Sequence, residues 1–181
     1  MKLDYETYEY IKSEAANLLL KYNISQIPIN GIDIARKMGI SLIKYSSLNS
    51  KKLSAAKQIS GDAFYLEIDN KEYIYYNENK NSGRINMTIL HEIGHCVLGH
   101  GSYMESDVAE AEANFFAKYI IAPPPLVDIF NPKNPEDIRK HFYISYEAAC
   151  NSFSYYNTWL SHRNVIKKYE VDLLENFKIT V

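Results

Sequence analysis

The segment His91-Glu92-Ile93-Gly94-His95 constrains this chain more tightly than any other feature. Residues four positions apart on an α-helix lie on one face with Cβ atoms about 5–6 Å apart, so the spacing predicts a helix whose two imidazoles reach one metal ion. Glu92 lies about 100° further round such a helix, where it can hold a water bound to that ion without being a ligand. The pattern is typical of zinc-dependent hydrolysis.

The composition indicates a globular protein of one domain. The chain has 181 residues, of which 46% are hydrophobic and 23% charged, and we expect a single domain over residues 1–181. The N-terminus lacks the pattern of a secretory signal, and no stretch reaches the roughly 18 apolar residues of a membrane span. With only Cys96 and Cys150, a disulfide framework is not expected. Together these features predict a cytoplasmic protein.

The charge balance bears on possible partners. The formal net charge is −2 and the sequence pI is about 6.2. Broad nucleic-acid binding needs a basic surface that displaces counterions, so direct binding to nucleic acid is not expected. Nothing in the sequence indicates an oligomeric state.

Hydrophobic periodicity predicts helices and a small sheet. We expect N-terminal helices and a first strand in 1–45, the sheet and the core of the metal site in 63–122, and C-terminal helices in 124–163. The expected helices span residues 4–22, 32–38, 83–98, 106–121, 126–130, 136–142 and 145–163. The expected strands span residues 40–45, 63–68 and 72–76. Residues 46–60 are interpreted as a loop or a frayed helix, and the tail 177–181 as a strand or a disordered end.

The two later strands are joined by Asp69-Asn70-Lys71, which predicts an antiparallel hairpin. The strand 72–76 is either a sheet edge that pairs with an extended substrate or a plain hairpin strand. In the helix that follows, Gly94 costs about 1 kcal/mol relative to alanine. A glycine there indicates that another element approaches the helix backbone closely, and the strands just before it are the obvious candidates.

A catalytic zinc needs a third protein ligand, and the helix 106–121 offers Glu110 and Glu112. These two residues lie about 200° apart on the helix, so they cannot both face inward. Glu112 lies within the apolar face, whereas Glu110 lies on the polar face. A carboxylate on a buried face needs a cation or strong donors, so we expect Glu112 to be the third ligand. The alternative is that Glu112 pairs with a basic side chain.

Two neutral histidines and one carboxylate would keep the metal a strong Lewis acid, which lowers the pKa of a bound water to about 7. Glu92 would take the proton of that water and pass it to the leaving amine. The metal would stabilise the oxyanion of the tetrahedral intermediate.

The sequence also resembles the ImmA/IrrE family of metallopeptidases. The resemblance is carried by His91 to His100, by Glu112-Ala113-Asn114-Phe115-Phe116-Ala117, by Pro123 and by the approach Arg84 to Leu90. It implies His91, His95 and Glu112 as ligands of one zinc ion and Glu92 as the catalytic carboxylate. It also implies an α+β, gluzincin-like zincin fold with a small, mostly antiparallel sheet on the His91–His95 helix and further helices at both ends.

The family's usual work is the intracellular cleavage of a repressor that carries a helix-turn-helix domain, in mobile elements and phages or in stress responses. The resemblance therefore implies a protein substrate of that kind. A second hypothesis is a non-proteolytic binding module on a peptidase scaffold, which sequesters a regulator or contacts DNA. A third is a zincin with a small peptide substrate.

Other candidate residues have less specific patterns. His100 follows His95 by five residues, which favours a role in supporting a ligand or capping the helix. Cys96 is expected to be a packing residue. For Asn114 we expect a structural role. The donor of a hydrogen bond to the oxyanion stays open among His141, His162, Tyr103, Tyr155 and Tyr156. The stretches 34–41 and 138–145 have the rhythm of helix-turn-helix pieces, which ordinary helix packing explains as well.

Overall fold

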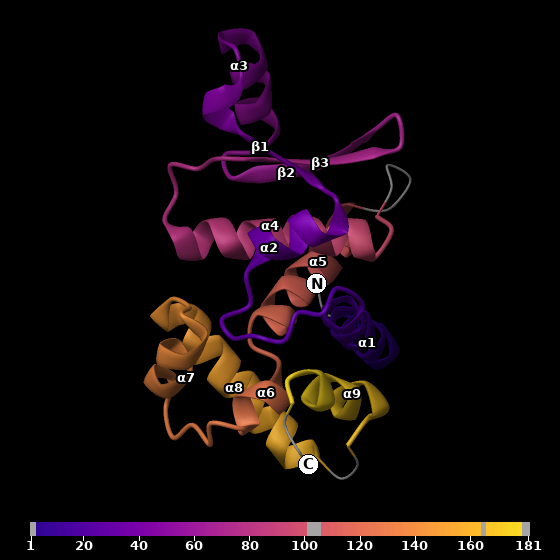
Figure 1. Cartoon of the computed structure of the whole chain (residues 1–181). Coiled ribbons are helices and arrows are strands. Elements are labelled where there is room, and N and C mark those ends of the chain that lie inside the picture. The colour runs from indigo at the N-terminus through magenta and orange to yellow at the C-terminus, as the bar shows by residue number, and fades with distance from the viewer. Residues whose placement is uncertain (1–2, 101–105, 164–165, 179–181) are drawn as a thin grey trace. The chain divides into compact units, whose positions relative to one another are not determined.

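The computed structural model describes residues 3–100, 106–163 and 166–178 (Figure 1). The chain divides into two compact units. Unit 1 comprises residues 30–117, and unit 2 comprises the residues before 30 and after 117. The expected single domain over residues 1–181 stays a prediction.

Unit 1 holds a three-stranded sheet and the helices around it. Its elements are α2 (Gly31–Met38), β1 (Ser41–Lys44), the 3-10 turn η1 (Tyr45–Ser47), α3 (Ser50–Ile59), β2 (Ala63–Ile68), β3 (Lys71–Tyr76), α4 (Ser82–Val97) and most of α5 (Ser106–Ile121). Within this unit the sheet lies between α3 on one side and α2 and α4 on the other (Figure 1).

The strand order is β1-β3-β2, with β3 in the centre. β3 pairs with β2 in antiparallel register over six residue pairs and with β1 in parallel register over four, so most of the pairing is antiparallel, as expected. The predicted hairpin is confirmed, and its turn residues Asp69 and Asn70 both have positive φ. The suggestion that residues 72–76 form a sheet edge is wrong, because β3 has a partner strand on each side.

The helix α4 packs against β2, β3 and α2. Its buried residues Ile89, Leu90 and Ile93 belong to the core of unit 1. The helix α2 begins directly on α4, because a Cβ atom at Gly31 would lie 3.1 Å from side-chain atoms of both Ile89 and Leu90. The Gly31 amide also donates a 2.6 Å hydrogen bond to the side-chain oxygen of Asn86. These contacts fix the face of α4 that the core covers.

Unit 2 is helical in its described part. It contains α1 (Tyr5–Lys21), α6 (Pro124–Asp128), α7 (Pro135–Phe142), α8 (Tyr146–His162) and α9 (Lys168–Asn176). Helix α1 packs on α9, and α7 packs on α8. Between α7 and α8 the chain turns at Tyr143, which adopts the left-handed conformation, and the Ser145 hydroxyl then caps α8.

The expected mixed α+β class is confirmed, with a small sheet on α4 and helices at both ends of the sequence. The segment interpreted as a loop or frayed helix contains α3, and α9 was not expected. Of the tail 177–181, residues 179–181 lie outside the described part of the chain. Among the described residues, every helix is too short or too polar to cross a membrane.

Candidate metal centre

The helix α4 carries the motif where the sequence predicts it. Its N-terminus is capped by Asn81, whose side chain accepts a hydrogen bond from the Arg84 amide, and the chain leaves the helix through Gly99 at a φ of 69°. The predicted close approach at Gly94 is present. The approaching element is α5, because a Cβ atom at Gly94 would lie 3.1 Å from Phe116 Cδ1 and 3.3 Å from Ala113 Cα. The strands proposed for that contact are therefore the wrong element.

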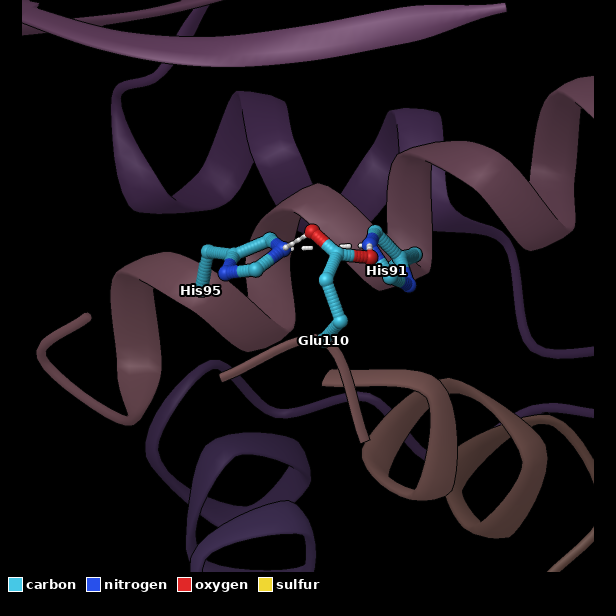
Figure 2. A group of neighbouring side chains, drawn as sticks. All are labelled: His91, His95 and Glu110. Carbon is cyan, nitrogen blue, oxygen red and sulfur yellow. Dashed lines mark hydrogen bonds and ion pairs between the residues drawn. The ribbon is translucent and has the colours of Figure 1, made fainter. Parts of the chain in front are cut away.

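His91 and His95 bring their ring nitrogens together one helical turn apart. Their Nε2 atoms lie 3.0 Å from one another. The carboxylate of Glu110, from α5, lies between the two rings (Figure 2), with 3.4 Å from one oxygen to His91 Nε2 and 3.3 Å from the other to His95 Nε2. One ligand atom from each of these three residues lies within 4.8 Å of the other two.

The carboxylate of this group is Glu110, whereas the sequence predicts Glu112 as the third ligand. Glu112 is not part of the three-residue group, and its Oε2 atom lies 2.9 Å from Nε2 of His100. The prediction of Glu112 requires that a ligand lie on the buried face of α5. In the structure the side chain of Glu110 is 57% exposed and that of Glu112 is 16% exposed. A site that must admit a substrate is open on one side, so an exposed carboxylate can complete it.

His100 lies beside the pair as a third imidazole. Its Nδ1 atom is 2.9 Å from Nδ1 of His95, and its side chain is only 2% exposed. For His91, an interaction with the Asn114 side chain of α5 raises the pKa, against the larger effect of burial.

Burial controls the charge of the two histidines. It is the largest cause lowering the pKa of His91, and it also lowers the pKa of His95, with the neighbouring His91 as the second cause. Desolvation disfavours the charged form of an imidazole. Both rings are therefore held neutral near pH 7, which is the state that binds a metal.

Glu92 is buried beside this group and is only 7% exposed. Burial raises its pKa to about 7, while a backbone hydrogen bond from Tyr65 of β2 opposes this shift and the charge of Glu110 adds to it. A carboxyl group with a pKa near neutrality can both accept and return a proton at physiological pH. The role of Glu92 as the catalytic base stays a prediction.

The remaining candidates have contacts of their own. The Cys96 thiol donates to Glu72 Oε1 at 2.8 Å, and burial raises its pKa to about 12, so it stays protonated. His141 stacks on Phe130 in unit 2 with ring centroids 4.0 Å apart, and His162 contacts the Thr158 carbonyl within its own helix. Three tyrosines complete the set. Tyr156 donates to Asp128, Tyr155 lies below the Lys12 ammonium, and Tyr103 lies outside the described residues.

The donor set fits a zinc ion. Two imidazole nitrogens and one carboxylate are a ligand combination of catalytic zinc sites, with Zn–N distances of about 2.0–2.1 Å. Tetrahedral geometry at those distances separates two ligand atoms by roughly 3.3 Å. The distance of 3.0 Å between the two Nε2 atoms is close to that value. The distances of 3.4 Å to His91 and 3.3 Å to His95 belong to the two different oxygens of Glu110, so its carboxylate spans the two imidazoles.

The greater part of the chain matches the model of a known protein family. The model of the peptidase M78 family, described as the IrrE N-terminal-like domain, matches residues 35–154. The matched range is about two thirds of the chain and includes all of α4 and α5. A comparison with curated proteins gave no match.

Proposed function

Because this chain belongs to the peptidase M78 family, the IrrE N-terminal-like domain, we propose that it is a zinc-dependent endopeptidase that cleaves a protein substrate. The family membership bears out the resemblance seen in the sequence and the zincin-like fold class. The proposed ligands are His91, His95 and Glu110, and the proposed general base is Glu92. The observation that carries the proposal is the three-residue group of ligand atoms within 4.8 Å, with a buried carboxyl group next to it in sequence.

The chemistry divides between a metal and the protein. His91, His95 and Glu110 would hold a zinc ion, which would supply Lewis acidity for the activation of water and the stabilisation of developing negative charge. Glu92 accepts a proton from the attacking water and donates it to the nitrogen of the leaving amine as the C–N bond breaks. Burial raises the pKa of Glu92 to about 7, which suits a group that both accepts and returns a proton near neutral pH.

The substrate is inferred from the family resemblance. Cleavage of a repressor with a helix-turn-helix domain is the usual activity of the ImmA/IrrE family, and we infer a substrate of that class here. Both cysteines are free thiols, as is usual in a reducing compartment, so we place the proposed reaction in the cytoplasm.

Metal content tests the ligand set. The purified protein should bind one equivalent of zinc, measured by elemental analysis after dialysis. His91→Ala, His95→Ala and Glu110→Ala should each lose it. Glu147→Ala removes an exposed carboxylate from α8 and should leave the zinc content unchanged. If Glu110→Ala keeps its full zinc content and Glu112→Ala loses it, then Glu112 is the third ligand, as the sequence predicts, and Glu110 is not a ligand.

Proteolysis is tested by a comparison of cells that express the wild type with cells that express Glu92→Gln. Mass spectrometry should find at least one protein shortened only with the wild type, and that protein should carry a helix-turn-helix domain. Purified wild type with zinc should cleave the same protein, and a chelator should stop the cleavage. A stable complex with that regulator and no shortened product would support the non-proteolytic binding module instead.

A further inference from the structure

Three side chains form a line of hydrogen bonds that leads to the proposed metal site. The Glu112 carboxylate lies 2.9 Å from Nε2 of His100, and Nδ1 of His100 lies 2.9 Å from Nδ1 of His95. The other nitrogen of His95, Nε2, faces His91 and Glu110. Both nitrogens of His95 and of His100 therefore have a defined neighbour.

We propose that His100 and Glu112 are positioning residues that fix the tautomer and the ring orientation of His95, so that its Nε2 lone pair points at the metal. The inference rests on the proposed zinc site. It assigns to Glu112 a function other than that of a ligand.

The Glu112 carboxylate at one end of this line determines which ring nitrogens of His100 and His95 carry a proton. An ionised carboxylate accepts hydrogen bonds and cannot donate them, so Nε2 of His100 carries the proton in its bond to Glu112. The Nδ1 atom of a neutral His100 is then an acceptor, and Nδ1 of His95 must supply the proton between them. A neutral His95 with its proton on Nδ1 has a free lone pair on Nε2, which is the form that binds zinc.

The backbone holds this arrangement in place. Gly99 adopts the left-handed conformation after the end of α4, and the amide of His100 donates a 3.0 Å hydrogen bond to the carbonyl of His95. The same two residues are thus joined through both main chain and side chains. With its side chain only 2% exposed, His100 is shielded from water that would compete for its nitrogens.

The helix α5 supports the two histidines of the motif separately. Glu112 contacts His100, which contacts His95, and Asn114 is among the groups that raise the pKa of His91. Glu110, two residues before Glu112, reaches the metal position directly. The short segment 110–114 therefore contains one proposed ligand and a partner for each of the other two.

Zinc affinity is the first test, measured by competition with a chelating dye. Loss of such an outer partner typically costs 10–100-fold in metal affinity, and we expect that increase in Kd for Glu112→Ala and for His100→Phe, which keeps the ring volume. Glu112→Gln should lose less than Glu112→Ala, because its carbonyl oxygen can still accept from His100. Asp107→Asn changes an exposed carboxylate of the same helix and should bind zinc as the wild type does.

The tautomer is the second test, which does not depend on enzymatic activity. Nitrogen-15 NMR of the histidine rings in the zinc-loaded protein should show His95 protonated on Nδ1 and bound to metal through Nε2. The Nδ1 proton should exchange with solvent much faster in His100→Phe. Thermal unfolding of each variant verifies that the fold is retained.

The outcomes separate this inference from the proposed function. If the wild type binds no zinc, the proposed function fails, and this inference fails with it. If the wild type binds zinc tightly and folded His100→Phe binds it within twofold of that affinity, the positioning role is overturned while the peptidase proposal stands. Equal, complete loss of zinc in Glu112→Gln and Glu112→Ala, with normal binding by Glu110→Ala, would make Glu112 a ligand and also overturn it.

Discussion

Gly94 of α4 lies so close to Phe116 of α5 that a Cβ atom at position 94 would be 3.1 Å from the ring. The Cα atom of Ala113 would be 3.3 Å away and, as backbone, cannot yield as a side chain does. Helix propensity alone would favour alanine at position 94 by about 1 kcal/mol, while overpacking costs about 1–3 kcal/mol. We expect Gly94→Ala to lower the free energy of unfolding by up to about 2 kcal/mol, as measured by urea denaturation.

The same helix offers a matched control for this prediction. A Cβ atom at Gly83 would have Asn81 Oδ1 as its nearest neighbour at 3.6 Å, an ordinary contact. Gly83→Ala should therefore be neutral or stabilising. Because α4 and α5 carry the proposed ligands, Gly94→Ala should also weaken zinc binding. Equal stability of the two alanine variants would show that α5 does not constrain position 94.

A second prediction concerns the bond between Asn86 and Gly31. The Asn86 side-chain oxygen accepts the Gly31 amide at 2.6 Å and ties the start of α2 to α4. An unpaired, part-buried donor costs about 1–3 kcal/mol, so Asn86→Ala should lower the free energy of unfolding by that amount. Amide hydrogen exchange at Gly31 should become faster. Asn86→Asp retains an acceptor and should recover part of the loss, and unchanged exchange in Asn86→Ala would contradict the prediction.

The dependence of stability on pH should include a contribution from Asp62. Hydrogen bonds from Arg84 lower its pKa from 3.8 to about 2, and Lys80 adds to the effect. Since the folded-state pKa is lower than the unfolded one, the contribution is complete above pH 4 and is lost as the pH falls towards 2. It is small, because these groups are near the surface and are screened by water and salt.

Asp62→Asn tests this contribution directly. The difference in free energy of unfolding between wild type and Asp62→Asn should be larger at pH 7 than at pH 3, and 0.5 M salt should reduce it. Asp33→Asn provides a comparison, because its pair with Arg36 spans 3.5 Å between two exposed side chains. If the difference in free energy of unfolding between wild type and Asp62→Asn is the same at both pH values, Asp62 does not contribute to the pH dependence of stability.

The elements that sequence patterns predicted well are those with a strong period or a distinct turn. The apolar stripe of α4 and the positive-φ pair Asp69 and Asn70 are such signals. The helix α3 has no apolar stripe, and Ala56 is its one buried residue among those described, so periodicity gave no signal there. The nine-residue α9 begins after Lys167, which is not a usual N-cap residue, and a glutamate three positions later supplies the cap instead.

At the candidate site, the sequence predicts the relation between residues of one helix but not the relation between two helices. The spacing of His91 and His95 fixes their relation, because both lie on one helix. The choice between Glu110 and Glu112 depends on the distance and angle between α4 and α5, and the period of a single helix contains neither. The position of His100 depends on the backbone reversal at Gly99. Helical periodicity therefore predicts the elements that carry the site, and its choice of Glu112 lacked the information on how α4 and α5 pack.

A last prediction concerns Glu170 in unit 2, which is only 4% exposed. One of its oxygens accepts the indole N–H of Trp159 at 2.6 Å, and the other accepts the Lys167 amide at 2.8 Å. A single carboxylate thus joins α8 to the start of α9. Glu170→Ala leaves both donors without this partner, and at about 1–3 kcal/mol for each unsatisfied donor we expect the unfolding free energy to fall by about 2–4 kcal/mol. Glu170→Gln, with one acceptor oxygen, should lose less.

Tryptophan fluorescence reports on this contact directly, because Trp159 is the one tryptophan of the chain. Its fluorescence should shift in Glu170→Ala before any unfolding, since the indole loses its acceptor, and urea titration of the same signal gives the stability. Zinc affinity should stay unchanged, because every proposed ligand lies in unit 1. Glu147→Ala, at an exposed position of the same α8, should change neither signal. Wild-type emission and stability in Glu170→Ala would mean that this carboxylate does not join the two helices.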